Sequence, residues 1–114
     1  QSDTHLLTVI RYIEANPLRA RLVHWAKQWP WSSFLFRQDP QNLGIVDPSP
    51  VLLPENWGDY VNSSLTMREL EAVRLSIRRQ SPLGEKDWVK KIAAQLGLSS
   101  TINPRGRPPK SLKK

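Results

Sequence analysis

A proline-rich stretch in the middle of the chain is the feature that most constrains its fold. Residues 38–56 mix turn-forming Asp, Asn, Gly and Ser residues with four prolines, Pro40, Pro48, Pro50 and Pro54. Each proline lacks a backbone N–H and has a fixed φ, so this stretch favours loops and turns over helix or strand. We therefore expect four successive parts: a helical part with an aromatic connector in residues 1–37, a proline-rich loop in 38–65, a two-helix module in 66–98 and a disordered basic tail in 99–114.

The size and the charge of the chain limit what it can be. Its 114 residues, 39% of them hydrophobic, suffice for one small domain with a modest core. Seventeen Lys and Arg against ten Asp and Glu give a formal net charge of +7, which favours a polyanionic partner. DNA, RNA, acidic proteins and an anionic membrane surface all stay open on charge alone. No apolar run approaches the roughly 20 residues that span a bilayer, and no signal peptide opens the chain, so we expect an intracellular protein without a membrane partner.

The chain offers little that could bind a metal ion. It has no cysteine, so disulfides and thiolate metal sites are excluded. Its two histidines, His5 and His24, are far apart in sequence and have no third ligand at the spacing of a metal site. We therefore expect no metal and no cofactor in this chain by itself. The chain opens with Gln1 directly before the first expected helix, which suggests a piece or a processed product of a longer protein.

Two short helices are expected before the loop. Residues 4–15 predict an amphipathic helix, because apolar side chains recur on one face at helical spacing: Leu6, Val9, Ile10 and Ile13. Asn16-Pro17 should end or kink this helix, since proline disfavours a helical residue before it but suits the first turn of a new helix. Residues 18–24 are then expected to form a short second helix.

Aromatic residues crowd the segment that follows. Three tryptophans and a phenylalanine fall within ten residues: Trp25, Trp29, Trp31 and Phe34. Clustered aromatic rings usually fill a core or cover its edge, and a small domain with few aliphatic residues needs such rings to build a core. We therefore expect these four side chains to pack inside the domain. The alternative is a platform on which unpaired bases stack, because aromatic faces accept any base.

Two further helices are expected after the loop, where Thr66 and Glu69 stand at the spacing of a capping box. The first has an apolar stripe of Leu70, Val73 and Ile77 and ends at the Ser-Pro-Leu-Gly of residues 81–84. The second runs from about residue 85 to 96, with Gly97 as its C-terminal cap and five side chains inward, Trp88, Val89, Ile92, Ala93 and Leu96. Residues 57–61 form too brief a pattern to assign.

Tyr12 is the first candidate functional residue. On the expected first helix it lies away from the apolar stripe, on the side of His5, Thr8 and Asn16. The simpler interpretation is a half-buried tyrosine whose hydroxyl reaches the surface. The functional interpretation is a nucleophile, because a tyrosine oxygen can attack phosphorus and hold a DNA strand as a covalent phosphotyrosine.

The basic tail is the second candidate site. Its Pro-Arg-Gly-Arg-Pro at residues 104–108 resembles the core of an AT-hook, and the residues expected to contact DNA are Arg105, Gly106, Arg107, Pro108 and Lys110. Glycine lets the backbone approach the floor of a narrow groove, and the arginines place guanidinium groups in the negative potential of A·T-rich minor grooves. The alternative is a solubilising basic tail, because short basic motifs recur by chance.

The residues around Tyr12 resemble a known family. Residues 12–20 read Tyr-Ile-Glu-Ala-Asn-Pro-Leu-Arg-Ala and residues 29–33 read Trp-Pro-Trp-Ser-Ser. Both strings are similar to the tyrosine-helix region of the REP-associated tyrosine transposases, which belong to the single-tyrosine HUH insertion-sequence transposases. Residues 69–108, with their Ser-Ile-Arg-Arg, Pro-Leu-Gly and Pro-Arg-Gly-Arg-Pro strings, also look like the C-terminal extension of many members.

The resemblance implies a fold and an activity. It implies a mostly α chain, the helical C-terminal part of an α+β, ferredoxin-like transposase, acting on single-stranded hairpin DNA near the nucleoid of a bacterial cytoplasm. Family members cleave and rejoin single strands with the helix tyrosine, a role that maps onto Tyr12. They also need a divalent cation such as Mg²⁺ on a His-hydrophobe-His pair, which this sequence lacks, so the chain alone should be weak or inactive. The alternative is a non-enzymatic helical DNA-binding module, in which residues 68–96 form a helix-turn-helix-like pair and Tyr12 is structural.

Overall fold

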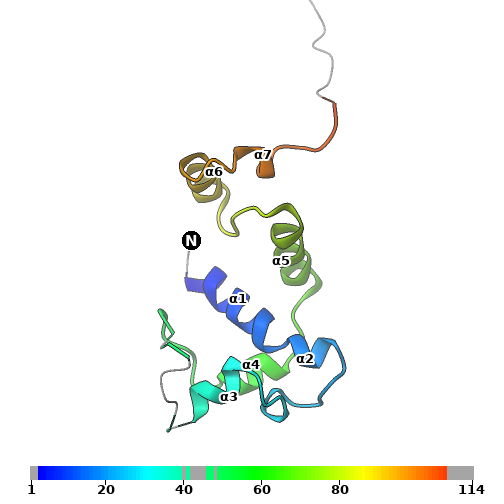
Figure 1. The fold of residues 1–114 in the computed structure, drawn as a ribbon, viewed down its shortest axis with the longest axis vertical. Helices are drawn as coiled ribbons and strands as arrows, with labels where there is room; N and C mark the ends of the chain where they lie inside the picture. Colours follow the sequence, from blue (N-terminus) through cyan, green and yellow to red (C-terminus); the bar gives the residue numbers. More distant parts are fainter. Residues whose placement is uncertain (1–2, 40, 42–45, 48, 108–114) are drawn as a thin grey trace, which may run out of the picture.

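The chain is mostly helical, as expected. The computed structural model describes residues 3–39, 41, 46, 47 and 49–107, and helices cover 59% of them, with no strand among these residues (Figure 1). The helices are α1 (Asp3–Glu14), α2 (Asn16–Arg19), the short 3₁₀ helix η1 (Ala26–Gln28), α3 (Ser33–Gln38), α4 (Trp57–Asn62), α5 (Met67–Arg79), α6 (Lys86–Gln95) and α7 (Ser99–Ile102). Within this described part, no helix is long and apolar enough to cross a membrane.

One small core holds the N-terminal half together. It is built from six buried side chains of α1, η1, α3, α4 and the α1–α2 corner: Ile10, Ala15, Ala26, Phe34, Trp57 and Val61. Helix α4 lies inside the stretch of residues 38–65 that was expected to be a proline-rich loop, and yet it packs against α1, so the loop interpretation is wrong for residues 57–62, which belong to this half (Figure 1). Helix α5 also contacts α1, whereas α6 packs against α7 at the far end of the molecule.

The first helix ends where Asn16-Pro17 predicted, but the second helix differs from the expectation. Pro17 lies in the first turn of α2, which starts at Asn16, two residues after the end of α1, and ends at Arg19. The chain then leaves the helix because Arg21 takes a left-handed conformation with φ of +57°. The expected helix over residues 18–24 is therefore wrong beyond Arg19.

The buried face of α1 is rotated from the expected stripe. Ile10 is buried, but Ile13 is 54% exposed, and the other two buried residues of α1 are Arg11 and Glu14. Sequence patterns place charged residues outward because an unpaired buried charge is costly. The charges of Arg11 and Glu14 both have partners, and both residues lie on the face of α1 that packs on α4.

The packing prediction for the tryptophans fails at two positions. Phe34 is buried in the core, but Trp25 is 54% and Trp31 is 79% exposed. The core positions of this segment are taken by Ala26 and Phe34, on η1 and α3, and both exposed tryptophans lie just before these elements rather than on their inner faces.

The caps predicted for the C-terminal helices are confirmed. Thr66 Oγ1 accepts a hydrogen bond from the Glu69 N–H at 3.2 Å, and Glu69 Oε2 accepts one from the Thr66 N–H at 2.8 Å. Helix α6 ends at Gln95, and Gly97 beyond it has a φ of +69°, a conformation that glycine adopts without strain. Along the expected stripes, Val73 and Ala93 are buried while Ile77 and Leu96 are exposed.

The tail begins later than expected, because residues 99–102 form helix α7. The turn at Gly97 lets the Leu98 N–H reach the Ala93 carbonyl at 2.7 Å, and Thr101 Oγ1 donates to the Leu98 carbonyl at 2.6 Å. Arg79 of α5 holds the end of this helix, since its Nε donates to the Thr101 carbonyl at 2.6 Å. Interpreting all of residues 99–114 as a disordered tail is therefore wrong for its first four residues.

Candidate nucleic-acid interface around Tyr12

Tyr12 lies in the last turn of α1 with its ring partly covered by an arginine. It is half-buried, and the guanidinium carbon of Arg19 lies 4.0 Å from the centroid of its ring. The Nη2 of Arg19 donates to the Tyr12 carbonyl at 2.8 Å and also to Oδ1 of Asn16. The Tyr, Asn and Arg of the motif in residues 12–20 thus form one local cluster.

The helix break at Pro17 builds this cluster. In an unbroken helix a residue seven positions after Tyr12 would lie two turns further along the axis, about 10 Å away. Because α2 starts a new direction at Asn16, Arg19 folds back over the preceding turn and reaches the ring. Proline at this position therefore favours the helix break that brings the Arg19 guanidinium over the Tyr12 ring.

The guanidinium of Arg19 is held in a partly dehydrated position. Burial lowers its pKa from the ordinary value, the contacts with Tyr12 raise it, and the charge of nearby Arg74 lowers it again. Its Nη1 is buried without a hydrogen-bond partner among the described atoms. Since an arginine stays protonated in proteins, Tyr12 has a permanent cation against its ring.

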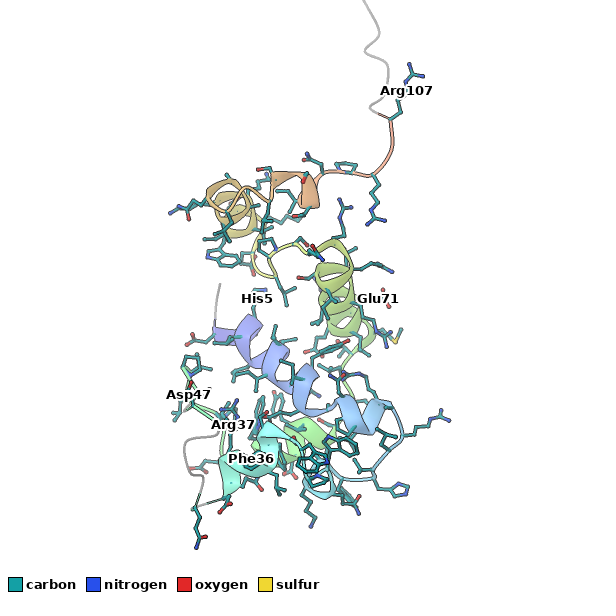
Figure 2. All side chains as sticks on the ribbon, in the orientation of Figure 1. His5, Phe36, Arg37, Asp47, Glu71 and Arg107 are labelled. Atoms are coloured by element: carbon teal, nitrogen blue, oxygen red, sulfur yellow. The ribbon has the colours of Figure 1, made fainter. Side chains whose placement is uncertain are left out.

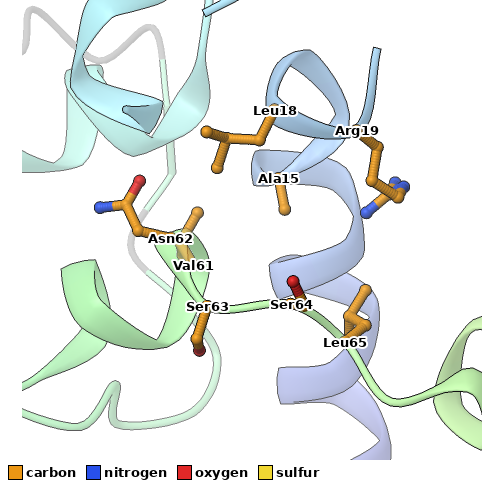
Figure 3. Close-up of a pocket in the computed structure, with 8 residues that line it drawn as sticks. All are labelled: Ala15, Leu18, Arg19, Val61, Asn62, Ser63, Ser64 and Leu65. Atoms are coloured by element: carbon orange, nitrogen blue, oxygen red, sulfur yellow. The ribbon is translucent and has the colours of Figure 1, made fainter. Parts of the chain in front are cut away.

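A small hollow adjoins this cluster (Figure 3). It lies between the α1–α2 corner, with Ala15, Leu18 and Arg19, and the segment of residues 61–65. Its volume of about 130 Å³ is below the roughly 300 Å³ at which small-molecule pockets begin. A large ligand such as a DNA strand would have to lie over this part of the surface rather than inside it.

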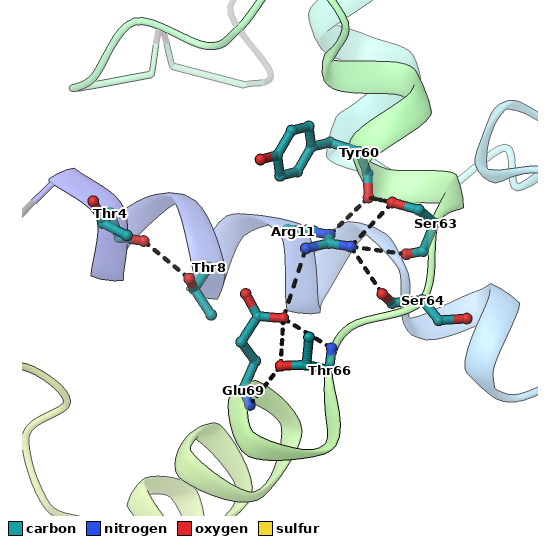
Figure 4. Close-up of polar contacts among 8 residues, drawn as sticks. All are labelled: Thr4, Thr8, Arg11, Tyr60, Ser63, Ser64, Thr66 and Glu69. Carbon is teal, nitrogen blue, oxygen red and sulfur yellow. Dashed lines mark hydrogen bonds and ion pairs between the residues drawn. The ribbon is translucent and has the colours of Figure 1, made fainter.

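Arg11 anchors the tyrosine helix to α4 (Figure 4). Its Nε donates to the Tyr60 carbonyl at 2.6 Å, and its Nη2 donates to the carbonyls of Ser63 and Ser64 and to the Ser63 hydroxyl, each at 3.1 Å. These carbonyls lie at the C-terminal end of α4, where helix carbonyls lack partners and attract positive charge. Its Nη1 also lies 3.8 Å from Oε2 of Glu69, which ties α1 to α5.

Glu14 anchors the other side of the same helix. Only 1% of this residue is exposed, and its carboxylate accepts hydrogen bonds from Ser33 Oγ at 2.7 Å, Arg37 Nε at 2.9 Å and Trp57 Nε1 at 2.8 Å. Figure 2 shows Arg37 on α3, next to Phe36. Sequence analysis missed Arg11 and Glu14 as positioning residues; the available signal was that both lie on the helix face of Leu7, at i+4 and i+7.

The two histidines lie apart. His5 is in the first turns of α1 with its Nε2 3.9 Å from Glu85 Oε1, and His24 is exposed beyond α2. Across the residues that the structure describes, no group of three His, Cys, Asp or Glu side chains is placed to hold a metal ion. These residues do not match the His-hydrophobe-His pair of the resembled family, and we assign no metal-dependent step to them.

The tail residues lie far from Tyr12. Arg105, Gly106 and Arg107 are exposed, and Gly106 has a φ of +116° that favours glycine. Figure 2 places Arg107 beyond α7, at the opposite end of the molecule from α3. Pro108 and Lys110, the other two residues expected to contact DNA, lie outside the described residues. The structure therefore keeps the two candidate sites separate.

Comparison with known proteins adds no relative. No family model matches the chain, and neither a curated protein nor a solved structure matches it. The functional assignment therefore depends on the residues themselves and on their geometry.

Proposed function

We propose that this chain is a DNA-binding, transposition-related protein in which Tyr12 is the nucleophile that a complete enzyme would use. The observation that carries the proposal is the Tyr12 cluster. The arginine of the motif that resembles the REP-associated transposases contacts both the tyrosine, at 4.0 Å between guanidinium and ring, and the asparagine. A phenol held next to a fixed cation is suited to a reaction at a phosphodiester, which carries a negative charge.

The proposed chemistry is a transesterification. The Tyr12 oxygen forms a bond to phosphorus, the bond from phosphorus to a deoxyribose oxygen breaks, and the released hydroxyl takes up the phenol proton. Arg19 would draw the phosphate toward the ring and stabilise the charge that develops on it. The complete enzyme would add an α+β, ferredoxin-like part with a histidine-bound divalent cation, and it would act on hairpin DNA in the bacterial cytoplasm.

The second candidate function is a non-enzymatic DNA-binding module. It is favoured by the partial burial of Tyr12 under Arg19, an arrangement that a structural tyrosine would also show. The expected helix-turn-helix-like pair of α5 and α6 does not support it, because α6 packs mainly against α7. Both candidate functions include DNA binding by the basic tail. A measurement of DNA binding by the tail therefore tests the claim that the two candidates share.

Removing the two tail arginines should weaken duplex binding selectively. We expect the double variant Arg105→Ala, Arg107→Ala to bind A·T-rich duplex roughly tenfold or more weakly, because two guanidinium groups leave a narrow groove. The loss should be smaller for G·C-rich duplex, whose minor groove is wider and less negative. Fluorescence anisotropy with both duplexes measures this difference.

The matched control is Arg68→Ala, Arg78→Ala, which removes the same charge from exposed positions of α5. It should lower affinity for both duplexes by the same modest factor, since only long-range attraction is lost. Equal effects of the two double variants on both duplexes would contradict a groove contact by the tail.

A further inference from the structure

Trp31 is a large apolar side chain that the fold leaves in water. It is the most exposed tryptophan among the described residues of the segment that begins at Trp25, and it follows Pro30 directly. A free indole face of this size is unusual on a small protein unless something covers it. Trp31 lies next to the helix that carries Tyr12, so the molecule that covers its indole is relevant to function.

The segment that presents Trp31 is held firmly in place. Ala26 is fully buried, and its N–H donates to Asn62 Oδ1 of α4 at 2.8 Å. Gln28 Oε1 accepts hydrogen bonds from the backbone N–H groups of His24 and Trp25, each at 2.9 Å. After Trp31 the chain enters α3, whose first turn is capped by Ser32 Oγ. The indole therefore stands on a fixed support, which lowers the entropic cost of binding.

Trp31 forms one wall of a hollow beside the end of α1. Its volume is about 230 Å³, and its lining comes from the end of α1 and the start of α2 and from residues 29–33: Ile13, Asn16, Pro17, Trp29, Trp31, Ser32 and Ser33. That volume is below the roughly 300 Å³ of small-molecule pockets, but the aromatic side chains in its mixed polar and apolar lining suit a single flat ring. Asn16 lies at its rim and hydrogen-bonds Arg19, so the hollow and the Tyr12 cluster share a border.

The segment that supplies most of the hollow's lining has a net positive charge, which favours a polyanion. Residues 15–38 contain four cations, Arg19, Arg21, Lys27 and Arg37, and neither Asp nor Glu. Arg37 is neutralised by Glu14, whereas Arg21 and Lys27 are exposed. A second copy of this chain, with its own formal net charge of +7, would be repelled from this surface. A strand with a phosphate on every nucleotide would be attracted to it.

We propose that this hollow binds one unpaired base of single-stranded DNA, stacked on Trp31, with the neighbouring phosphate near Asn16 and Arg19. The inference rests on the proposed function and specifies how the strand is held beside Tyr12. Stacking on an aromatic face is tolerant of base identity, so the site would hold an unpaired nucleotide without reading its sequence. A base-paired nucleotide could not enter, because its faces are already stacked.

The test measures the affinity of the full chain for a fluorescein-labelled oligothymidylate, which forms no base pairs. Trp31→Ala should weaken binding between about 5-fold and 100-fold, the range that stacking on one aromatic ring gives. Trp31→Phe should restore most of the affinity, because it keeps a flat ring. Trp25→Ala is the matched control, an exposed tryptophan of the same segment that lies outside this hollow, and it should change affinity less than about twofold.

The remaining outcomes separate this inference from the proposed function. If the chain binds oligothymidylate but Trp31→Ala binds equally well, the stacking site is wrong while DNA binding stands. If Trp31→Ala instead turns a dimer into a monomer in sedimentation and leaves DNA affinity unchanged, the surface is a contact between copies and the proposal is overturned. Absence of binding to every DNA tested would overturn both.

Discussion

Glu14→Ala should destabilise the protein by roughly 3–5 kcal/mol, which is the range for removing one partner of a buried ion pair. The substitution leaves the Arg37 guanidinium without its carboxylate and the buried indole N–H of Trp57 without an acceptor. An orphaned buried donor alone costs about 1–3 kcal/mol. Since small domains are stable by only about 5–15 kcal/mol, a large part of the total would be lost.

Urea unfolding followed by circular dichroism measures this effect as a shift of the midpoint. Glu14→Gln should lie between the wild type and Glu14→Ala, because the amide oxygen can still accept from Trp57 or Ser33 but carries no charge. Glu71→Ala is the matched control: its pair with Arg74, at 3.7 Å, is half-exposed and should contribute no more than about 1 kcal/mol. Equal midpoints for Glu14→Ala and Glu71→Ala would show that the buried carboxylate does not hold α1 in place.

The sequence predicted the caps of α5 and α6 correctly, because a cap depends on only a few neighbouring residues. The capping box at Thr66 and Glu69 and the glycine after α6 depend only on neighbouring backbone, so the sequence is sufficient to locate them. Helix α2 was placed too late because its end depends on the left-handed conformation of Arg21, a residue type that seldom adopts it. Helix α7 was missed because Arg79, from another helix, holds its end.

The buried face of α1 and the Tyr12 cluster could not be predicted in the same way. Whether Arg11 or Ile13 turns inward depends on the carbonyls of Tyr60, Ser63 and Ser64, which lie 49 to 53 positions further along the chain. Periodicity counts only apolar residues, so it assigned Ile13 to the core and made no assignment for Arg11. The contact of Arg19 with Tyr12 depends on the angle between two short helices, which the motif indicates through Pro17 but does not determine.

Tyr12→Phe should abolish a covalent protein–DNA adduct in a complemented protein. The chain alone should form no adduct with single-stranded hairpin DNA, with or without Mg²⁺, because it lacks the His-hydrophobe-His pair of the resembled family. Supplying a segment with that pair, fused or in trans, should produce a denaturant-resistant band on a gel. Tyr12→Phe removes the attacking oxygen and should remove the band completely.

The phenylalanine variant also controls for folding. It keeps the ring under Arg19 and deletes only the hydroxyl, so stability should change by no more than about 1 kcal/mol. Tyr60→Phe, on the α4 tyrosine that stacks with Arg11, is a matched hydroxyl deletion and should leave the adduct intact. An adduct that forms equally well with Phe at position 12 would contradict the assignment of Tyr12 as the nucleophile. The non-enzymatic DNA-binding module would then replace it as the proposed function.

The central claim is that this chain binds DNA, and a salt titration of the complex tests it most directly. Each phosphate neutralised by a Lys or Arg contributes about −0.7 to the slope of log affinity against log salt for a single strand. With about four contacts, affinity for a single-stranded hairpin should fall roughly 50-fold between about 50 and 200 mM salt. Anisotropy measured at these two salt concentrations should show that fall. No binding at the lower salt concentration to either single- or double-stranded DNA would contradict the account.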